Sequence, residues 1–179
     1  MPDYLAGHLI HWHNDQSSLR QSPPVLQPWL WASGSLTRQL TQIASGQFGV
    51  KPFRQGFERI YWHESQLMAL PMDQQAWVRE VYLYGCGSLP WVKARSIIPL
   101  KTLKGRGLRL RYLKNRSLGS LLFHRTQPQC IRQVARLDEG WTRRSLYLWH
   151  QQPIIVQETF LPEFQHFLLN QKFLLASPC

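Results

Sequence analysis

Six stretches of the chain combine β-branched or aromatic residues with bounding Gly, Pro or Asp, and each has the length of one strand. This pattern predicts strands, because branched and aromatic side chains pack well on a pleated, half-buried surface. The predicted strands are residues 53–62, 77–84, 91–100, 130–137, 145–149 and 154–161. Residues 85–90 and 150–153 are short enough to join two antiparallel strands as hairpins.

Helical periodicity is confined to two places. Leu36, Leu40 and Ile43 recur at helical spacing behind Ser35, a residue type that favours the N-cap position. They predict a helix within residues 29–44, and residues 117–124 predict a second, short helix. Strands joined by tight turns with few helices indicate the α+β class, with an antiparallel sheet of about six strands.

The alternation of side chains along these strands draws attention to three charged residues. Successive strand residues point to opposite faces, and Arg79 and Glu158 each fall on the more apolar face of their strand. Arg95 falls beside Trp91 and Ile97 in the same way. A buried charge costs several kcal/mol, roughly, unless it is paired. Arg79 and Glu158 therefore either form a structural salt bridge with each other or line a pocket, where they hold a carboxylate and a hydroxyl.

Composition limits the classes of protein to which the chain belongs. The 179 residues are 44% hydrophobic and 12% aromatic, which excludes a disordered chain and suits one domain over residues 1–179. No stretch approaches the roughly 18 unbroken apolar residues of a membrane helix, and residues 1–20 lack the features of a signal peptide. Three widely spaced cysteines form no disulfide framework and no zinc motif. We therefore expect a cytoplasmic protein with no stable membrane insertion and no bound metal.

The net charge of +11 is concentrated in residues 101–116, which hold seven Lys or Arg and no acid. Such a segment can bind nucleic acid, can attract a small anionic substrate, or can be a solvated face with no ligand. No zinc-finger or RNP-type motif supports nucleic-acid binding, and we expect none. His8, His11 and His13 lack an acidic or Cys partner at ligand spacing, and P-loop, GxGxxG and GxSxG motifs are absent.

Five short blocks, in order along the chain, resemble the bacterial chorismate pyruvate-lyase family. They are WVRE at 77–80, PW at 90–91 with ARSIIP at 94–99, SLGSLLF at 117–123, GWTRRS at 140–145 and ETFLP at 158–162. The likeness is strongest over residues 77–162. In the first third it is limited to residues 29–30 and 35–37, and residues 1–28 and 163–179 are expected to be peripheral.

The resemblance implies a monomeric, cofactor-free enzyme that splits chorismate into 4-hydroxybenzoate and pyruvate, the first committed step toward ubiquinone. It also implies a single α+β domain whose ligand is buried beneath helical, flap-like segments. The family's product-binding arginine falls on Arg79 and its acidic residue on Glu158. Main-chain contacts to the product carboxylate fall on Leu118 and Leu36, where relatives often carry Met. Arg95 lies in a matching block and is expected to meet the enolpyruvyl carboxylate.

Two other functions remain open from the sequence. Effector-binding domains of some bacterial regulators share this fold without catalysis, although residues 1–50 show no helix-turn-helix. The basic segment 101–116 leaves a nucleic-acid-binding module as the weaker alternative.

Overall fold

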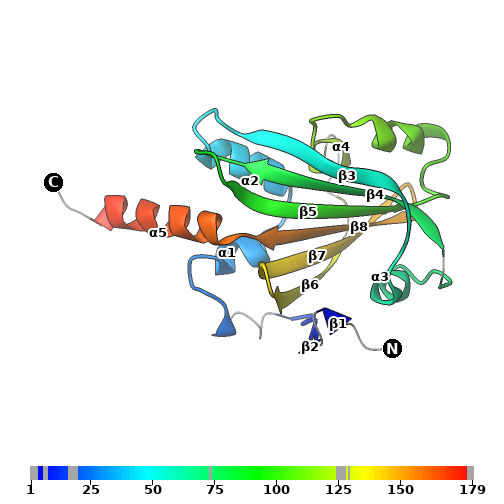
Figure 1. Ribbon diagram of the computed structural model, residues 1–179, viewed down its shortest axis with the longest axis horizontal. Coiled ribbons are helices and arrows are strands. Elements are labelled where there is room, and N and C mark those ends of the chain that lie inside the picture. The colour runs from blue at the N-terminus through cyan, green and yellow to red at the C-terminus, as the bar shows by residue number, and fades with distance from the viewer. Residues whose placement is uncertain are drawn as a thin grey trace.

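A single six-stranded antiparallel sheet forms the centre of the protein, in the order β3-β4-β5-β8-β7-β6 (Figure 1). The computed structural model describes residues 4–5, 8–15, 20–72, 74–123, 128 and 130–176. The strands of the sheet are β3 (Gly49–Arg59), β4 (Gln75–Tyr84), β5 (Pro90–Pro99), β6 (Cys130–Leu137), β7 (Gly140–Trp149) and β8 (Gln152–Phe160). The predicted α+β class and the six-stranded antiparallel sheet are confirmed.

The largest differences between the predicted and the observed strands are in β3 and β7. Strand β7 begins at Gly140, whereas the sequence pattern predicted a start at 145. Strand β3 ends at Arg59, and the predicted continuation to residue 62 is wrong because helix α3 (Trp62–Leu67) begins there. The Glu64 carboxylate accepts a hydrogen bond from the main-chain N–H of Tyr61 at 2.9 Å, which satisfies a donor at the start of this helix.

The predicted helix over 29–44 is two helices, α1 (Gln27–Leu30) and α2 (Leu36–Ile43). Between them Gly34 has a φ of +83°, a conformation that a helix cannot contain and that glycine adopts without strain. Ser35 is the N-cap of α2, as predicted, and its hydroxyl accepts a hydrogen bond from the N–H of Arg38 at 3.3 Å.

The remaining helices are the 3₁₀ helix η2 (Gly105–Tyr112), the short α4 (Gly119–Leu122) and the C-terminal α5 (Pro162–Ala176). The N-terminal strands β1 (Tyr4–Leu5) and β2 (His8–Leu9) form a separate two-stranded sheet. His13 then forms a β-bridge with Val134, so the N-terminal segment lies against the outer edge of β6.

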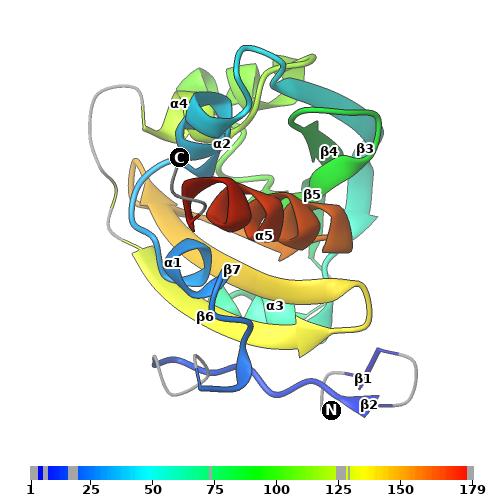
Figure 2. The same ribbon diagram turned by 90° about the vertical axis from the view of Figure 1, so that its left-hand side faces the viewer.

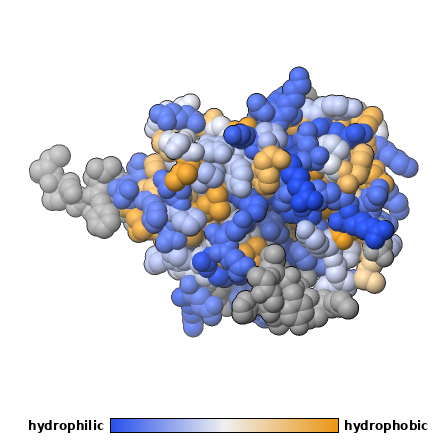
Figure 3. Space-filling view, viewed as in Figure 1, coloured by the Kyte–Doolittle hydropathy of each residue, from blue (hydrophilic) through white to orange (hydrophobic). Residues whose placement is uncertain are grey.

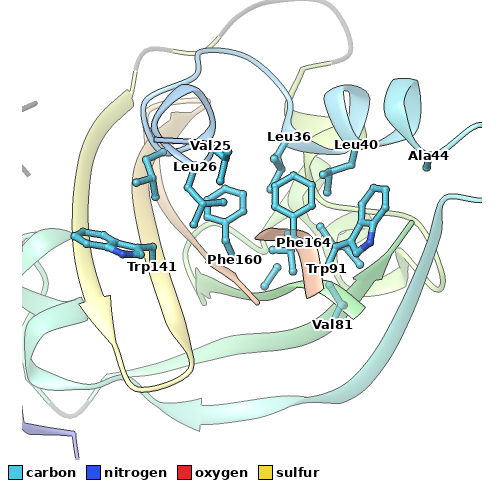
Figure 4. Packing of buried hydrophobic residues seen from close by; sticks show 14 of the residues in the cluster. Val25, Leu26, Leu36, Leu40, Ala44, Val81, Trp91, Trp141, Phe160 and Phe164 are labelled. Atoms are coloured by element: carbon cyan, nitrogen blue, oxygen red, sulfur yellow. The ribbon is translucent and has the colours of Figure 1, made fainter. Parts of the chain in front are cut away.

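Most helices cover one face of the sheet. Figure 2 shows α1, α2 and α5 on the inside of its curve, and Figure 4 shows their apolar side chains meeting those of the strands. A second cluster of buried side chains packs η2 and α4 over the other half of this face. Helix α3 contributes to a smaller cluster on the opposite face. The covered face is therefore where a ligand can be enclosed.

Helix α5 leaves the body of the protein at one end (Figure 1), but its first turn belongs to the core. Phe164 is fully buried and its ring lies 4.9 Å from that of Trp29, 5.4 Å from that of Trp91 and 5.7 Å from that of Phe160. The start of the segment predicted to be peripheral thus closes one end of the sheet.

Gly140 gives a test of how closely β7 and β8 approach. A Cβ atom there would lie 2.1 Å from the main-chain oxygen of Phe160, and neither strand can move away without breaking the ladder. We expect Gly140→Ala to lower the free energy of unfolding by about 2–3 kcal/mol, measured by urea denaturation.

Gly56→Ala is the matched control, because a Cβ at Gly56 in edge strand β3 meets nothing within 4 Å. Its unfolding free energy should change by about 0.5 kcal/mol or less. Equal stabilities of the two variants would contradict the close approach at Gly140.

Candidate ligand site

A partly enclosed cavity lies between the covered face of the sheet and the helical segments above it. The space not filled by protein atoms is about 460 Å³, including open solvent at the mouth of the cavity. Its wall includes Arg79 and Glu158 from the sheet, with Leu36 and Leu118 from the covering segments. The fold therefore brings four of the five residues proposed from the sequence to one cavity.

Arg79 is buried on the cavity wall with a relative exposure of 2%. Its Nη2 donates to the main-chain oxygens of Lys114 at 2.6 Å and Arg116 at 3.0 Å. Within the part of the chain that the structure describes, its Nε has no hydrogen-bond partner. Burial lowers the pKa of the guanidinium to about 10, so Arg79 is still a cation at neutral pH. A buried cation with an unused donor is a suitable partner for a carboxylate.

Glu158 does not pair with Arg79. Its Oε2 accepts a hydrogen bond from Nε of Arg143 at 2.6 Å, and Arg143 itself is only 1% exposed. The salt bridge that the sequence left open as an alternative is therefore made with another arginine. Glu158 nevertheless lines the same cavity as Arg79.

Arg143 also connects Glu158 to the covering segment between α1 and α2. Its Nη1 donates to the main-chain oxygens of Trp29 at 2.6 Å and Ala32 at 3.3 Å. Arg132 donates to the same Ala32 oxygen. Two arginines of the sheet thus hold the segment that leads to Leu36.

The two covering segments also contact each other. The Thr37 hydroxyl donates to Oγ of Ser117 at 2.7 Å, which joins the start of α2 to the segment before α4. Leu36 is the first residue of α2, and Leu118 is the N-cap of α4. Main-chain N–H groups at the start of a helix have no acceptor within that helix, so these two positions can offer donors to an anion.

Arg95 is not part of the cavity. The strand register places it beside Glu80 on one side and Gln157 on the other, on the opposite face of the sheet from Arg79. There its Nε donates to Oε1 of Glu64 at 2.9 Å, and its guanidinium lies 4.8 Å from the centre of the Tyr61 ring. The expected contact with an enolpyruvyl carboxylate does not fit this position.

The alternation argument placed Arg95 with Trp91, and that grouping is wrong for a specific reason. Leu83 pairs with Val92 but Tyr84 pairs with Pro90, so Trp91 is an extra residue in a β-bulge. A bulge breaks the two-residue period, and Trp91 therefore packs under the helices while Arg95 points to the other face.

Arg143, which holds Glu158, and Tyr147, which lines the cavity, were not identified from the sequence. Both lie on β7, on the same face as Glu158. Extending the predicted strand 145–149 toward Gly140 would have placed Arg143 in register with the inward face. The error in one strand boundary thus hid the partner of Glu158.

The basic segment is anchored at its centre. Leu110 of η2 is fully buried, and Leu103 and Leu113 on either side pack in the same cluster as Trp77. The guanidinium of Arg111 lies 4.8 Å from the centre of the Trp77 ring. Part of the charge run therefore covers the sheet, and the expectation that this segment binds no nucleic acid stays a prediction.

Together, the curved antiparallel sheet and its helix-covered face define an α+β domain with a cavity between the two. Structural comparison agrees: the effector domain of PhnF from Mycobacterium smegmatis is similar with a TM-score of 0.54 and 13% identity, covering 73% of this chain and 90% of that one. At this identity the likeness shows the fold alone.

Sequence comparison is more specific, and the chain belongs to the chorismate lyase family, whose profile matches residues 8–168. A probable chorismate pyruvate-lyase of Acinetobacter baumannii is 50% identical over 148 residues, which cover 83% of this chain and 88% of the relative. Its counterpart in Acinetobacter baylyi is 47% identical over 145 residues, covering 81% and 87%. The family match extends beyond the five sequence blocks toward both ends.

Hydrophilic residues cover much of the face shown in Figure 3. Within the described part of the chain, no helix has both the length and the apolar character needed to cross a bilayer.

The Arg143–Glu158 pair predicts a strong energetic coupling. Arg143→Met leaves a buried carboxylate without its partner and should cost about 3–5 kcal/mol of unfolding free energy, whereas replacing both residues with Met and Leu should cost less than the sum of the single changes. A double-mutant cycle by urea denaturation measures the difference.

The exposed pair Lys93–Glu139, with Nζ 2.8 Å from Oε1, is the control pair. Its coupling should be about 1 kcal/mol or less. If the Arg143 and Glu158 changes were additive, the buried pair would not stabilise the site.

Proposed function

We propose that this protein is a chorismate lyase, which converts chorismate into 4-hydroxybenzoate and pyruvate. Membership of the family and the names of the relatives support the activity. We further propose that the product serves ubiquinone synthesis and that the reaction takes place in the cytoplasm. The expected monomeric state remains a prediction.

The observation that carries the proposal is the pair of complementary charges on one cavity wall. Arg79 is a buried cation whose bonds within the described chain are to main-chain oxygens, and Glu158 is a buried carboxylate two strands away. Chorismate has a ring carboxylate at one end and a hydroxyl at the other. The ring carboxylate is proposed to bind Arg79 and the main-chain N–H groups of Leu36 and Leu118, and the hydroxyl to donate to Glu158.

The chemistry requires little beyond binding and orientation. When the ether bond breaks and the ring loses the hydrogen beside the hydroxyl, the ring becomes aromatic, and this gain drives the reaction. The protein must hold the dianion in a reactive pose and stabilise the charge that develops on the departing oxygen. Glu158 is proposed to orient the hydroxyl and to assist movement of the ring proton. Arg143 acts through Glu158, as a positioning residue.

The covering segments suggest what limits turnover. A ligand in the cavity lies beneath them, and Arg79 bonds directly to the main chain of the 114–116 segment. The same guanidinium is proposed to hold the product carboxylate. Release of an enclosed aromatic product is therefore expected to be slow relative to chemistry.

The first test is turnover of chorismate by the purified protein. We expect 4-hydroxybenzoate and pyruvate to appear in equal amounts, well above the spontaneous rate, when the reaction is followed by chromatography. Folded protein that binds 4-hydroxybenzoate but forms neither product would instead support the non-catalytic effector-binding alternative.

The second test separates the roles of the two charged residues. Arg79→Ala should weaken 4-hydroxybenzoate binding by about 100-fold, because the charge-assisted contact to the product carboxylate is lost. Glu158→Gln keeps an acceptor for the hydroxyl, so product affinity should stay within about tenfold while kcat falls by about 100-fold or more. Isothermal titration and steady-state kinetics provide these values.

Arg109→Ala is the control for charge alone, because Arg109 lies on η2 and not on the cavity wall. It should leave saturable product binding in place. Full activity in both the Arg79 and Glu158 variants, with intact folds, would show that the site is elsewhere.

A further inference from the structure

Tyr147 is a buried, titratable cavity residue that the proposed mechanism does not yet use. It is 3% exposed, lines the cavity, and its ring makes an edge-to-face contact with Phe123 at 5.6 Å between centres. Phe123 also lines the cavity, so the ring is fixed from the cover side.

Tyr147 lies on the same face of β7 as Arg143, the partner of Glu158. Tyr147, Ser145 and Arg143 alternate on one face, opposite Ile154, Val156 and Glu158 of β8. Ser145 lies between Tyr147 and Arg143 on this face. Tyr147 and Glu158 line the same cavity, and the phenol is close enough to Glu158 for the charge of the carboxylate to raise its pKa.

The hydroxyl keeps its proton at neutral pH. Burial raises the pKa of Tyr147, and the negative charge of Glu158 raises it further, against smaller opposing effects of Arg132, Arg143 and Ser145. A neutral phenol can donate one hydrogen bond to a ligand.

The line from Arg79 to Glu158 crosses the sheet diagonally and divides the cavity wall into two sides. The strand register puts only apolar residues on one side, namely Val81, Leu83 and Ala94. Ser96, Val156 and Tyr147 lie on the other side, and two of these carry hydroxyls. The two sides therefore differ in what they can bind.

Chorismate is also asymmetric about the line from its ring carboxylate to its hydroxyl. Its ether oxygen is on the ring carbon next to the one that carries the hydroxyl, and the attached enolpyruvyl group bears a second carboxylate. If the ring carboxylate binds Arg79 and the hydroxyl faces Glu158, the ether oxygen lies near the Glu158 end, on one side of the axis. Polar atoms are better placed on the side that offers donors.

Resting on the proposed function, we infer that the Ser96–Tyr147 side receives the enolpyruvyl half of chorismate, and that Tyr147 donates a hydrogen bond to the ether oxygen as the carbon–oxygen bond breaks. The electron pair of that bond moves to the ether oxygen. The ring hydrogen leaves as a proton and ends on the methylene carbon of the enolpyruvate, which becomes pyruvate. No oxidant or reductant is needed, and Tyr147 retains its own proton.

Tyr147→Phe tests this role, since it removes only the hydroxyl. We expect kcat for chorismate to fall by about tenfold to 100-fold, as for loss of one donor to a developing charge. Affinity for 4-hydroxybenzoate should stay within about twofold, because the product lacks the ether. A lower kcat with unchanged product affinity indicates a contact made during the reaction. A purely structural role of the hydroxyl would change both kcat and product affinity.

Tyr82→Phe is the matched control. Tyr82 is on β4 but faces away from the cavity, where its ring stacks on Phe53 at 4.5 Å between centres. Its kinetics and product binding should match those of the unaltered protein. Urea denaturation of both variants checks that their stabilities are similar.

Two outcomes would overturn the inference, and they are distinguishable. If the unaltered protein converts chorismate and Tyr147→Phe does so at the same kcat, or loses product affinity as strongly as kcat, the role of Tyr147 is wrong while the proposed function stands. If the unaltered protein forms no 4-hydroxybenzoate or pyruvate, the proposed function fails and this inference fails with it.

Discussion

The burial of the Arg79 guanidinium is the constraint on which the rest of the site depends. Removing a cation from water is costly, and no acidic residue of the described chain forms an ion pair with Arg79. The cost is partly offset by two main-chain oxygens, which belong to the segment that covers the cavity. The buried guanidinium therefore holds the segment that covers the cavity, and one of its donors remains unused. A bound carboxylate would neutralise the charge and accept a hydrogen bond from that donor.

The second buried arginine on this face has the opposite character. Arg143 is paired with Glu158 and donates to the main chain before α2, so its charge is paired and its Nε and Nη1 have acceptors without a ligand. Arg143 holds one covering segment while Arg79 holds the other, and Thr37 and Ser117 join the two. The difference in pairing suggests why one arginine can serve as an anchor for the ligand and the other as support for the carboxylate.

The sequence predicted much of this from simple periodicity. Alternation in 77–84 and 154–161 placed Arg79 and Glu158 on inward faces, and the register puts both on the cavity wall. The prediction from periodicity failed where the regular spacing of a strand or a helix is interrupted. The bulge at Trp91 moved Arg95 to the other face, and the late predicted start of β7 left Arg143 out of the strand. Gly34 lies between two helices, whereas the apolar spacing alone had predicted one continuous helix.

The sequence by itself determined the elements, their antiparallel connection and the inward direction of two charges, because these depend on local periodicity and on short turns. Only the tertiary structure decided which charges pair. Glu158 meets Arg143 because β7 and β8 are neighbours in register, whereas Arg79 lies two strands away and meets carbonyl oxygens of a segment 35 residues further along the chain. Contacts of this kind depend on strand order and on how the covering segments pack, and neither is encoded in the pattern of any single segment.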